Sequence, residues 1–169
     1  MIIEVKGDIL FSDAEAIAHG VAPMDKFQSG LALELRKNHP SMVKDFRHFC
    51  RNRHPKEGNI WLWQGVGENG QTVKIFNLLT QQHPPSQNAQ PGRAKVEYVR
   101  QTLKNLAQRV QKEGIKSLAV PKLATGVGAL DWKDVKPLLM EYLDPLRIPV
   151  FVYSTYVAGQ KAKESNTLT

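Results

Sequence analysis

Short apolar runs alternate along the chain with segments in which apolar residues recur at helical spacing. The runs, bounded by turn residues, predict strands at about residues 2–6, 16–20, 59–64, 72–79, 117–121 and 148–153. Helical spacing is clearest in residues 94–112, at Val96, Val99, Leu103, Leu106 and Val110. This segment is predicted to form an amphipathic helix that ends at Gly114.

Shorter helices are predicted between the other strands. Leu31 and Leu35 indicate a helix that stops near Pro40, and another follows it, with apolar positions at Val43, Phe46, Phe49 and Cys50. A last helix is predicted over about 135–143, with Pro137 in its first turn, where a missing N–H is tolerated. Strands separated by helices indicate a three-layer α/β protein, in which helices cover both faces of a mixed, largely parallel sheet.

The length of 169 residues and the hydrophobic content of 41% fit one domain with one substantial core. We assign this domain to residues 1–157. The polar end of the chain indicates that residues 158–169 form a flexible, frayed tail. Residues 83–92, HPPSQNAQPG, contain three prolines and no apolar period, which predicts an exposed loop.

Composition excludes several classes of protein. No segment approaches the roughly 20 apolar residues of a membrane span, and the N-terminus lacks the basic and apolar regions of a secretory signal. Cys50 is the only cysteine, so the chain holds neither a disulfide framework nor a C-x-x-C pair. We therefore expect a cytoplasmic protein with no membrane partner.

The net charge of +7, with a pI near 9.6, favours polyanionic partners such as nucleic acid or phosphorylated ligands. The positive charges are spread along the chain, several of them on the predicted outer faces of helices. Their alternative role is solvation of those faces. Charge alone therefore leaves contact with nucleic acid open.

GVGENG, at residues 65–70, has the G-x-G-x-x-G spacing of dinucleotide-binding turns. That motif needs a strand before it and a helix after it, so that the pyrophosphate meets a helix N-terminus. Here the following QTVKIFNLL is predicted to be another strand. We interpret residues 65–70 as a hairpin loop.

The stronger candidate for a phosphate loop is PKLATGVGALDW. Here the strand at 117–121 leads into Thr125, Gly126, Val127, Gly128 and Ala129, and then into a helix. Glycines permit positive φ and close approach of the backbone, so N–H groups of this loop can turn toward a phosphate or pyrophosphate. The loop lacks G-K-[ST] and is not a Walker A loop. A tight connection without a ligand is the alternative.

Two further segments follow strands, at the sheet edge where α/β proteins bind ligands. Asp8, in Gly7-Asp8-Ile9, can accept a hydrogen bond from an exocyclic amine such as that of adenine, or it belongs to a turn or helix cap. HGVAPMDKFQSGLA, after the second strand, can supply a second phosphate-facing backbone and side chains near a sugar. Its alternative is an ordinary surface loop.

No familiar catalytic motif is present, neither H-E-x-x-H nor G-x-S-x-G nor a clear pair of carboxylates. The five histidines lack the spacing of metal ligands. We therefore expect no metal site and no cofactor.

VKGDIL, AIAHGVAPMDKFQSGLALELRK, NLLTQQ and LATGVGALDWKDV together resemble the macro domain family over nearly the whole chain. The similarity is greatest to the branch of DNA ADP-ribosyl glycohydrolase antitoxins and terminal ADP-ribose protein glycohydrolase. The resemblance implies the macro domain fold and a ligand of the ADP-ribose class, either free or on an ADP-ribosylated protein or nucleic acid.

The resemblance also implies site residues. Asp8 and the Ile9 backbone would hold the adenine, and the backbone from Thr125 to Leu130 would hold the pyrophosphate. The distal side would be formed by Gly30 and Leu31, and the adenosine end flanked by Tyr153, Ser154 and Thr155. Further ligand-binding candidates are Gly20, Gln28 and Gln81.

The chain departs from the family where relatives carry catalytic groups. Glycohydrolases of this branch have a lysine just after the central strand, whereas this chain has Thr80-Gln81-Gln82, and an amide is neither a nucleophilic amine nor a cation. Gly128 stands where the terminal ADP-ribose enzyme has a catalytic aspartate, and residues 19–23 replace an asparagine-rich sugar loop. The mechanism of the relatives therefore does not transfer.

Two functional hypotheses remain. The chain either hydrolyses an ADP-ribose linkage on a protein, a nucleic acid or an acyl ester, or it reads ADP-ribose without turnover. The absence of an effector domain favours the enzyme. Its general base would be Asp25, in the sugar-side loop, or His19, whose ordinary pKa suits proton transfer near neutrality. A third hypothesis, nucleic-acid binding without ADP-ribose, leaves both ligand-facing loops unexplained.

Overall fold

The computed structural model describes residues 1–67 and 69–165. Its strands form one sheet in the order β1-β6-β5-β2-β4-β3. All neighbouring strands are parallel except β3 and β4, which form a hairpin as predicted. Gly65 and Val66 still belong to β3, so the connection is shorter than the predicted loop at 65–70, and residue 68 lies outside the described part. The strands are β1 (Ile2–Gly7), β2 (Ala16–Val21), β3 (Ile60–Val66), β4 (Thr72–Leu79), β5 (Leu118–Pro121) and β6 (Val150–Tyr156).

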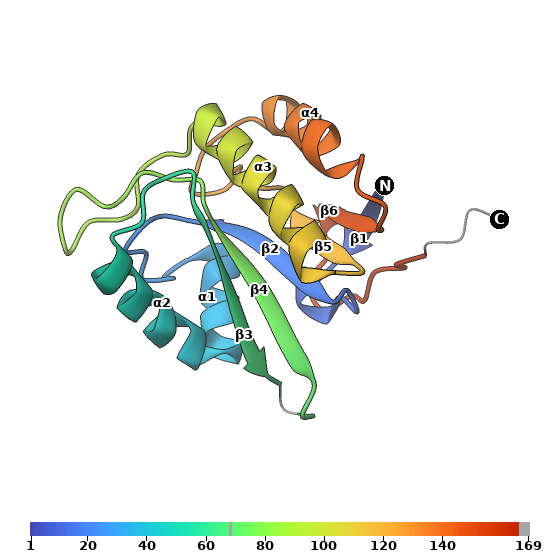
Figure 1. Cartoon of the computed structure of the whole chain (residues 1–169), viewed down its shortest axis with the longest axis horizontal. Coiled ribbons are helices and arrows are strands. Elements are labelled where there is room, and N and C mark those ends of the chain that lie inside the picture. The colour runs from blue at the N-terminus through green and yellow to red at the C-terminus, as the bar shows by residue number, and fades with distance from the viewer. Residues whose placement is uncertain (68, 166–169) are drawn as a thin grey trace.

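Helices cover both faces of this sheet, which confirms the predicted three-layer α/β fold (Figure 1). One face packs against α3 and α4, and the opposite face against α1 and α2. A short 3-10 helix, η1, follows β1. The bounds are η1 (Ile9–Phe11), α1 (Gly30–Asn38), α2 (Pro40–Arg53), α3 (Val96–Glu113) and α4 (Trp132–Leu143).

The strand and helix periods explain how the two cores are filled. Ala16 and Ala18 on β2 join the core under α3 and α4, whereas Val21 joins the core under α2. On α3, the predicted stripe from Val99 to Val110 is buried, and Gly114 ends the helix in the left-handed conformation, with φ of +65°. The longest predicted helix is therefore confirmed.

The prediction for Pro137 is wrong. Helix α4 begins at Trp132, because the side chain of Asp131 accepts a hydrogen bond from the Lys133 N–H and caps it. Pro137 consequently lies inside the helix rather than in its first turn. It cannot donate the backbone hydrogen bond that this position normally makes to the preceding turn.

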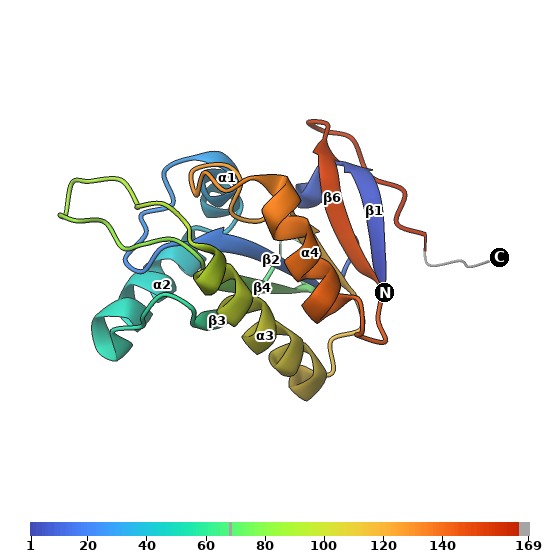
Figure 2. The same cartoon turned by 90° about the horizontal axis from the view of Figure 1, so that it is seen from above.

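The end of the chain also differs from the expected frayed tail. Residues 158–165 run beside β1 (Figure 2). The Ala162 side chain is buried there, and the Glu164 carboxylate accepts hydrogen bonds. The sequence did not predict this packing, because the segment is short and polar and its hydrogen-bonding partners lie about 150 residues away in the chain. Residues 166–169 lie outside the described part, and the domain boundary at 157 stays a prediction. Across the described residues, no helix combines the length and apolarity of a membrane span.

Candidate functional site

A cleft of about 690 Å³ opens at the edge of the sheet where the parallel strands end. Its walls come from parts of the segments that follow β1, β2, β4 and β5, and from the end of β6. This is the edge at which open α/β sheets bind ligands, and the volume lies in the range of small-molecule sites, about 300–1,000 Å³.

Most of the predicted site residues come together here. Those that line the cleft are Asp8, Ile9, His19, Gly20, Asp25, Gln28, Gly30, Leu31, Gln81, Thr125, Gly126, Val127, Gly128, Tyr153 and Ser154. Ala129, Leu130 and Thr155 do not line it.

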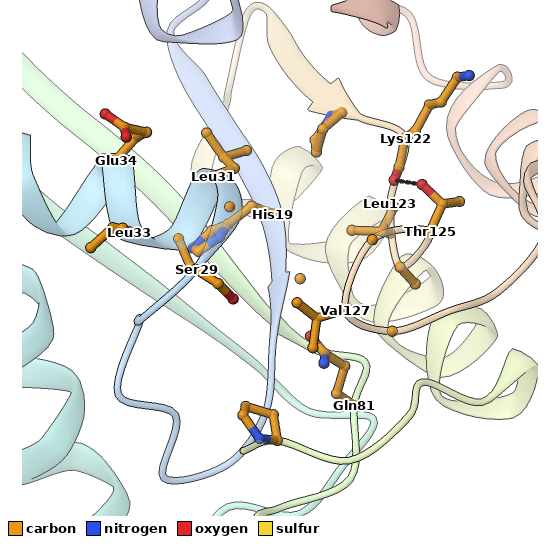
Figure 3. Close-up of a pocket in the computed structure, with 18 of the residues that line it drawn as sticks. His19, Ser29, Leu31, Leu33, Glu34, Gln81, Lys122, Leu123, Thr125 and Val127 are labelled. Atoms are coloured by element: carbon orange, nitrogen blue, oxygen red, sulfur yellow. Dashed lines mark hydrogen bonds between the residues drawn. The ribbon is translucent and has the colours of Figure 1, made fainter.

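The loop after β5 offers unpaired backbone donors. The N–H groups of Gly126, Val127 and Gly128 find no hydrogen-bond acceptor within residues 1–67 and 69–165. The loop itself is held by bonds at its two ends, from the Thr125 hydroxyl to the Lys122 carbonyl (2.7 Å, Figure 3) and from the Leu130 N–H to the Ala124 carbonyl (3.0 Å). Consecutive free N–H groups in a fixed loop form a site for an anion.

The two glycines of this loop serve different purposes. A Cβ at Gly128 would lie 2.7 Å from the Ala124 carbonyl oxygen and 2.9 Å from the Cβ of Ala94, so no side chain fits there. A Cβ at Gly126 would meet no atom within 4 Å. The expected positive φ falls instead on Ala124 (64°) and Ala129 (63°), a correction to the prediction that the glycines supply it.

Helix α1 begins on the opposite wall of the cleft. Gly30 has φ of +58°, a conformation that glycine adopts without strain. Ser29 makes no side-chain cap, and its hydroxyl lies on the cleft side of the helix, across from Val127 (Figure 3). The first N–H groups of a helix have no intrahelical acceptor, so this end adds to the positive potential.

Asp8 marks the other end of the cleft. The residue is 5% exposed, and its Oδ1 accepts from the Leu10 N–H (3.1 Å) and its Oδ2 from the Gly159 N–H (2.9 Å). The alternative role as a helix cap is therefore real, because the Leu10 bond caps η1. Each oxygen retains a further lone pair, so capping leaves room for a ligand donor.

Asp25 is committed to its own loop. Oδ2 accepts from the Ala22 N–H (2.9 Å) and Oδ1 from the Phe27 N–H (2.8 Å), which holds the turn that contains Met24 and Phe27 at positive φ. Burial raises the pKa of the Asp25 carboxyl, and the two backbone hydrogen bonds oppose that shift. The carboxylate therefore stabilises the loop between β2 and α1.

His19 is a buried side chain at the floor of the cleft. Its Nε2 lies 2.7 Å from Oδ1 of Asn77, and since a carbonyl oxygen only accepts, Nε2 carries the proton. Nδ1 is left as a buried acceptor with no partner among the described residues. Burial lowers the pKa of His19 to about 4, so the ring is neutral near pH 7.

Gln81 lines the cleft beside Val127 (Figure 3). Its Nε2 donates to the Gly92 carbonyl (3.1 Å), which ties it to the loop at 83–92. That loop also receives a bond from Nζ of Lys26 to the Gln87 carbonyl (2.5 Å). The predicted exposed loop thus returns to the site and supplies Pro84, Ala89, Gln90 and Pro91 to its wall.

No local sequence signal marks these four residues, because contacts with distant segments bring them to the cleft. Tyr156 was also missed; it is 70% exposed at the end of β6 and lines the cleft. Its signal is its place at the carboxyl end of a strand, directly after Tyr153, Ser154 and Thr155. Within the described residues, no three His, Cys, Asp or Glu side chains gather as metal ligands would.

Comparison with known proteins gives the family. The Macro domain model matches residues 26–139 of this chain. The chain belongs to the macro domain family. The match covers the walls contributed by α1, the loop at 83–92 and the loop after β5.

Curated relatives of this macro domain are longer proteins. The DNA ADP-ribosyl glycohydrolase of Thermus aquaticus is 30% identical over 156 residues, which cover 90% of this chain and 41% of the relative. A DNA ADP-ribosyl transferase-DNA ADP-ribosyl glycohydrolase fusion protein of Thermosipho africanus is 29% identical, over 88% of this chain and 40% of the relative. The chain thus spans about two fifths of their length.

Solved structures agree with this relationship. The macrodomain of Thermus aquaticus DarG superposes with a TM-score of 0.78 at 28% identity, covering 91% of this chain and 98% of that one. Thermosipho africanus DarTG in complex with ADP-ribose superposes with a TM-score of 0.79 at 25% identity, covering 95% of this chain and 42% of that one. These matches confirm the fold and the kinship with DNA ADP-ribosyl glycohydrolases that the motifs indicated.

Proposed function

We propose that this macro domain binds ADP-ribose, free or at the end of an ADP-ribosylated macromolecule, in the cleft at the sheet edge. The observation that carries the proposal is the run of unpaired N–H groups at Gly126, Val127 and Gly128 in the described structure. Hydrogen bonds to a charged group are worth about 1.5–3 kcal/mol each, and micromolar affinity requires roughly 8 kcal/mol. Three such bonds to a pyrophosphate would supply a large share of that energy.

The rest of the cleft suits the other parts of the ligand. Asp8 and Ile9 would meet the adenine, because a carboxylate accepts from an exocyclic amine. The first turn of α1, with Gly30 and Leu31, would lie along the distal side, where Gln28 and Gln81 would orient the sugar. The related DarTG structure contains ADP-ribose, which supports this choice of ligand.

Isothermal titration calorimetry with ADP-ribose tests the proposal directly. We expect a dissociation constant in the micromolar range and stoichiometric binding. Absence of binding up to millimolar ADP-ribose, in a chain that unfolds cooperatively, would overturn it.

Hydrolysis of the ADP-ribose linkage is the second candidate function. The relatives are named as glycohydrolases, which favours this function. Asp25 also favours it, because burial raises the pKa of this cleft carboxyl toward the neutral pH at which a general base works best. Asp25 would accept the proton of an attacking water, with His19 as the alternative. Against this role stand the two backbone bonds of Asp25 and the depressed pKa and deep burial of His19. Recognition is therefore the primary proposal.

A turnover assay separates the two functions. Release of ADP-ribose from ADP-ribosylated DNA or protein by the wild-type chain would establish the enzyme. Micromolar binding without release from either substrate would leave the reader alone.

We propose a nucleic acid as the macromolecule that carries the ADP-ribose. The curated relatives are named for DNA, and the chain has a net charge of +7. On α2, Lys44, Arg47 and Arg51 are exposed, and none forms an ion pair within the described residues. Affinity for an ADP-ribosylated oligonucleotide should exceed that for free ADP-ribose at low salt and converge with it as salt rises. A salt-independent difference would argue against nucleic acid.

A further inference from the structure

The segment after β6 folds back onto the nucleobase end of the cleft. The Gly159 N–H donates to Oδ2 of Asp8 (2.9 Å), and the Asp8 N–H donates to the Gln160 carbonyl (2.7 Å). The Ala162 side chain, 7% exposed, belongs to the cluster that holds Val5 and Ile9. Figure 2 shows this segment running beside β1.

Glu164 fastens the far end of the segment. Its carboxylate accepts hydrogen bonds from the Ser12 hydroxyl (2.6 Å), the Asp13 N–H (2.8 Å) and the Tyr153 hydroxyl (2.5 Å). Burial, and after it the bond to Glu164, raises the pKa of Tyr153, so the phenol stays protonated as the donor. One carboxylate therefore joins the end of the segment to β6 and to the turn after η1.

The C-terminal segment comes closest to β1 at Gly7. Its φ is +156°, and a Cβ there would lie 2.8 Å from the Gln160 carbonyl oxygen and 2.9 Å from the Cβ of Ala162. The last residue of β1 therefore has no room for a side chain, because the backbone of the C-terminal segment occupies that space. The neighbouring Asp8 is held between this segment and η1.

Two donors on different segments fix the carboxylate of Asp8. The Leu10 N–H holds Oδ1 and the Gly159 N–H holds Oδ2, so rotation about the Cβ–Cγ bond breaks at least one bond. We infer that residues 157–164 are a positioning element that orients the Asp8 carboxylate and thereby sets the preference for a nucleobase with an exocyclic amine. The inference rests on the proposed function, since it takes the base of an ADP-ribose-like ligand to end at Asp8.

The chemistry of the base explains why orientation affects selectivity. A fixed carboxylate oxygen accepts from the N6 amine of adenine and repels the O6 carbonyl oxygen of hypoxanthine. A carboxylate free to rotate turns away from that oxygen and loses part of the discrimination. Selectivity between the two bases, rather than affinity alone, therefore reports on the C-terminal segment.

The test uses the 169-residue chain with Glu164→Ala, which removes the acceptor of all three hydrogen bonds to Glu164. Glu141→Ala is the matched control, because Glu141 is an exposed carboxylate on α4 that pairs with Arg100. Calorimetry compares ADP-ribose with inosine diphosphate ribose. We expect the wild type and the control to prefer ADP-ribose by about tenfold, the equivalent of one hydrogen bond, and Glu164→Ala to prefer it by about twofold.

Tyr153→Phe provides a milder second variant, since it deletes one donor to Glu164 and keeps the ring. We expect an intermediate ratio from it. An unchanged ratio in both variants, with ADP-ribose still bound, overturns the inference and leaves the proposed function standing. Failure of the wild type to bind either ligand overturns the proposed function itself.

Discussion

Nε2 of His19 lies 2.7 Å from Oδ1 of Asn77, with both side chains shut off from solvent at the centre of the sheet. Because burial lowers the pKa of His19 to about 4, the folded chain keeps the ring neutral where the unfolded chain protonates it. The unfolded state then binds more protons below its pKa of 6.5, so stability is complete above that pH and is lost as pH falls toward 4.

We expect protonation of His19 in the unfolded chain to lower the free energy of unfolding by about 1.4 kcal/mol for each pH unit below 6.5. Denaturant unfolding at pH 7, 6 and 5 measures the slope. His19→Gln should flatten it, and His39, whose pKa burial also lowers, should supply the remainder. His48→Gln, an exposed histidine, is the control. Identical slopes in wild type and His19→Gln would contradict the prediction.

The two glycines of the phosphate loop should respond oppositely to substitution. Gly126→Val is expected to fold with nearly wild-type stability, because a Cβ there meets no atom, and to bind ADP-ribose at least about tenfold more weakly, because the added side chain stands at the cleft. Gly128→Ala is expected to lose about 1–3 kcal/mol of stability through overpacking against Ala94 and Ala124.

Thermal melting and calorimetry on the two variants separate these effects. Unchanged ADP-ribose affinity in Gly126→Val would remove the phosphate loop from the binding site. A fully stable Gly128→Ala would mean that the loop moves away from Ala94 at little cost.

Asp25 is predicted to stabilise its loop whether or not it takes part in catalysis. Asp25→Ala leaves the N–H groups of Ala22 and Phe27 without acceptors, which should cost about 1–3 kcal/mol in denaturant unfolding. Asp25→Asn keeps one acceptor and should cost less. If the wild type releases ADP-ribose, Asp25→Asn should stop release while affinity stays within about threefold. Normal release by Asp25→Asn would exclude Asp25 as the base.

The sequence predicted the strands, the helices and the binding edge well, because each depends on local pattern. Apolar periods place β2 and α3 within two residues of their observed bounds, and polar or glycine-rich segments after parallel strands must share one edge. Both the Asp8 and the Thr125–Gly128 segments were found in this way.

Features that depend on distant partners could not be predicted. Lys26 and Gln81 bind the loop at 83–92 beside the cleft, and Asp8, Ser12, Asp13 and Tyr153 hold residues 159–164 in place. Polar sequence looks the same whether such partners exist or not.

Helix α4 gained its first turn from the Asp131 cap, which outweighed the expected boundary near Pro137.

Gln81 stands where resemblance to the glycohydrolase branch implies a lysine. Gln81 is 6% exposed, lines the cleft, and donates to the Gly92 carbonyl, a bond that a lysine ammonium or amine can also make. Burial lowers the pKa of a lysine and thereby favours a neutral, nucleophilic amine. We expect Gln81→Lys to release ADP-ribose from ADP-ribosylated DNA at least about tenfold faster than the wild type.

Gln82→Lys is the matched control for this change, because it adds the same side chain at a neighbouring residue that does not line the cleft. Release is followed by chromatography of free ADP-ribose, with calorimetry to show that both variants still bind it. Equal rates in the two variants would mean that the added amine at residue 81 lacks access to the reacting bond. Faster release in Gln81→Lys alone would show that the amide at residue 81 limits hydrolysis in the wild type, which then binds ADP-ribose without cleaving its linkage.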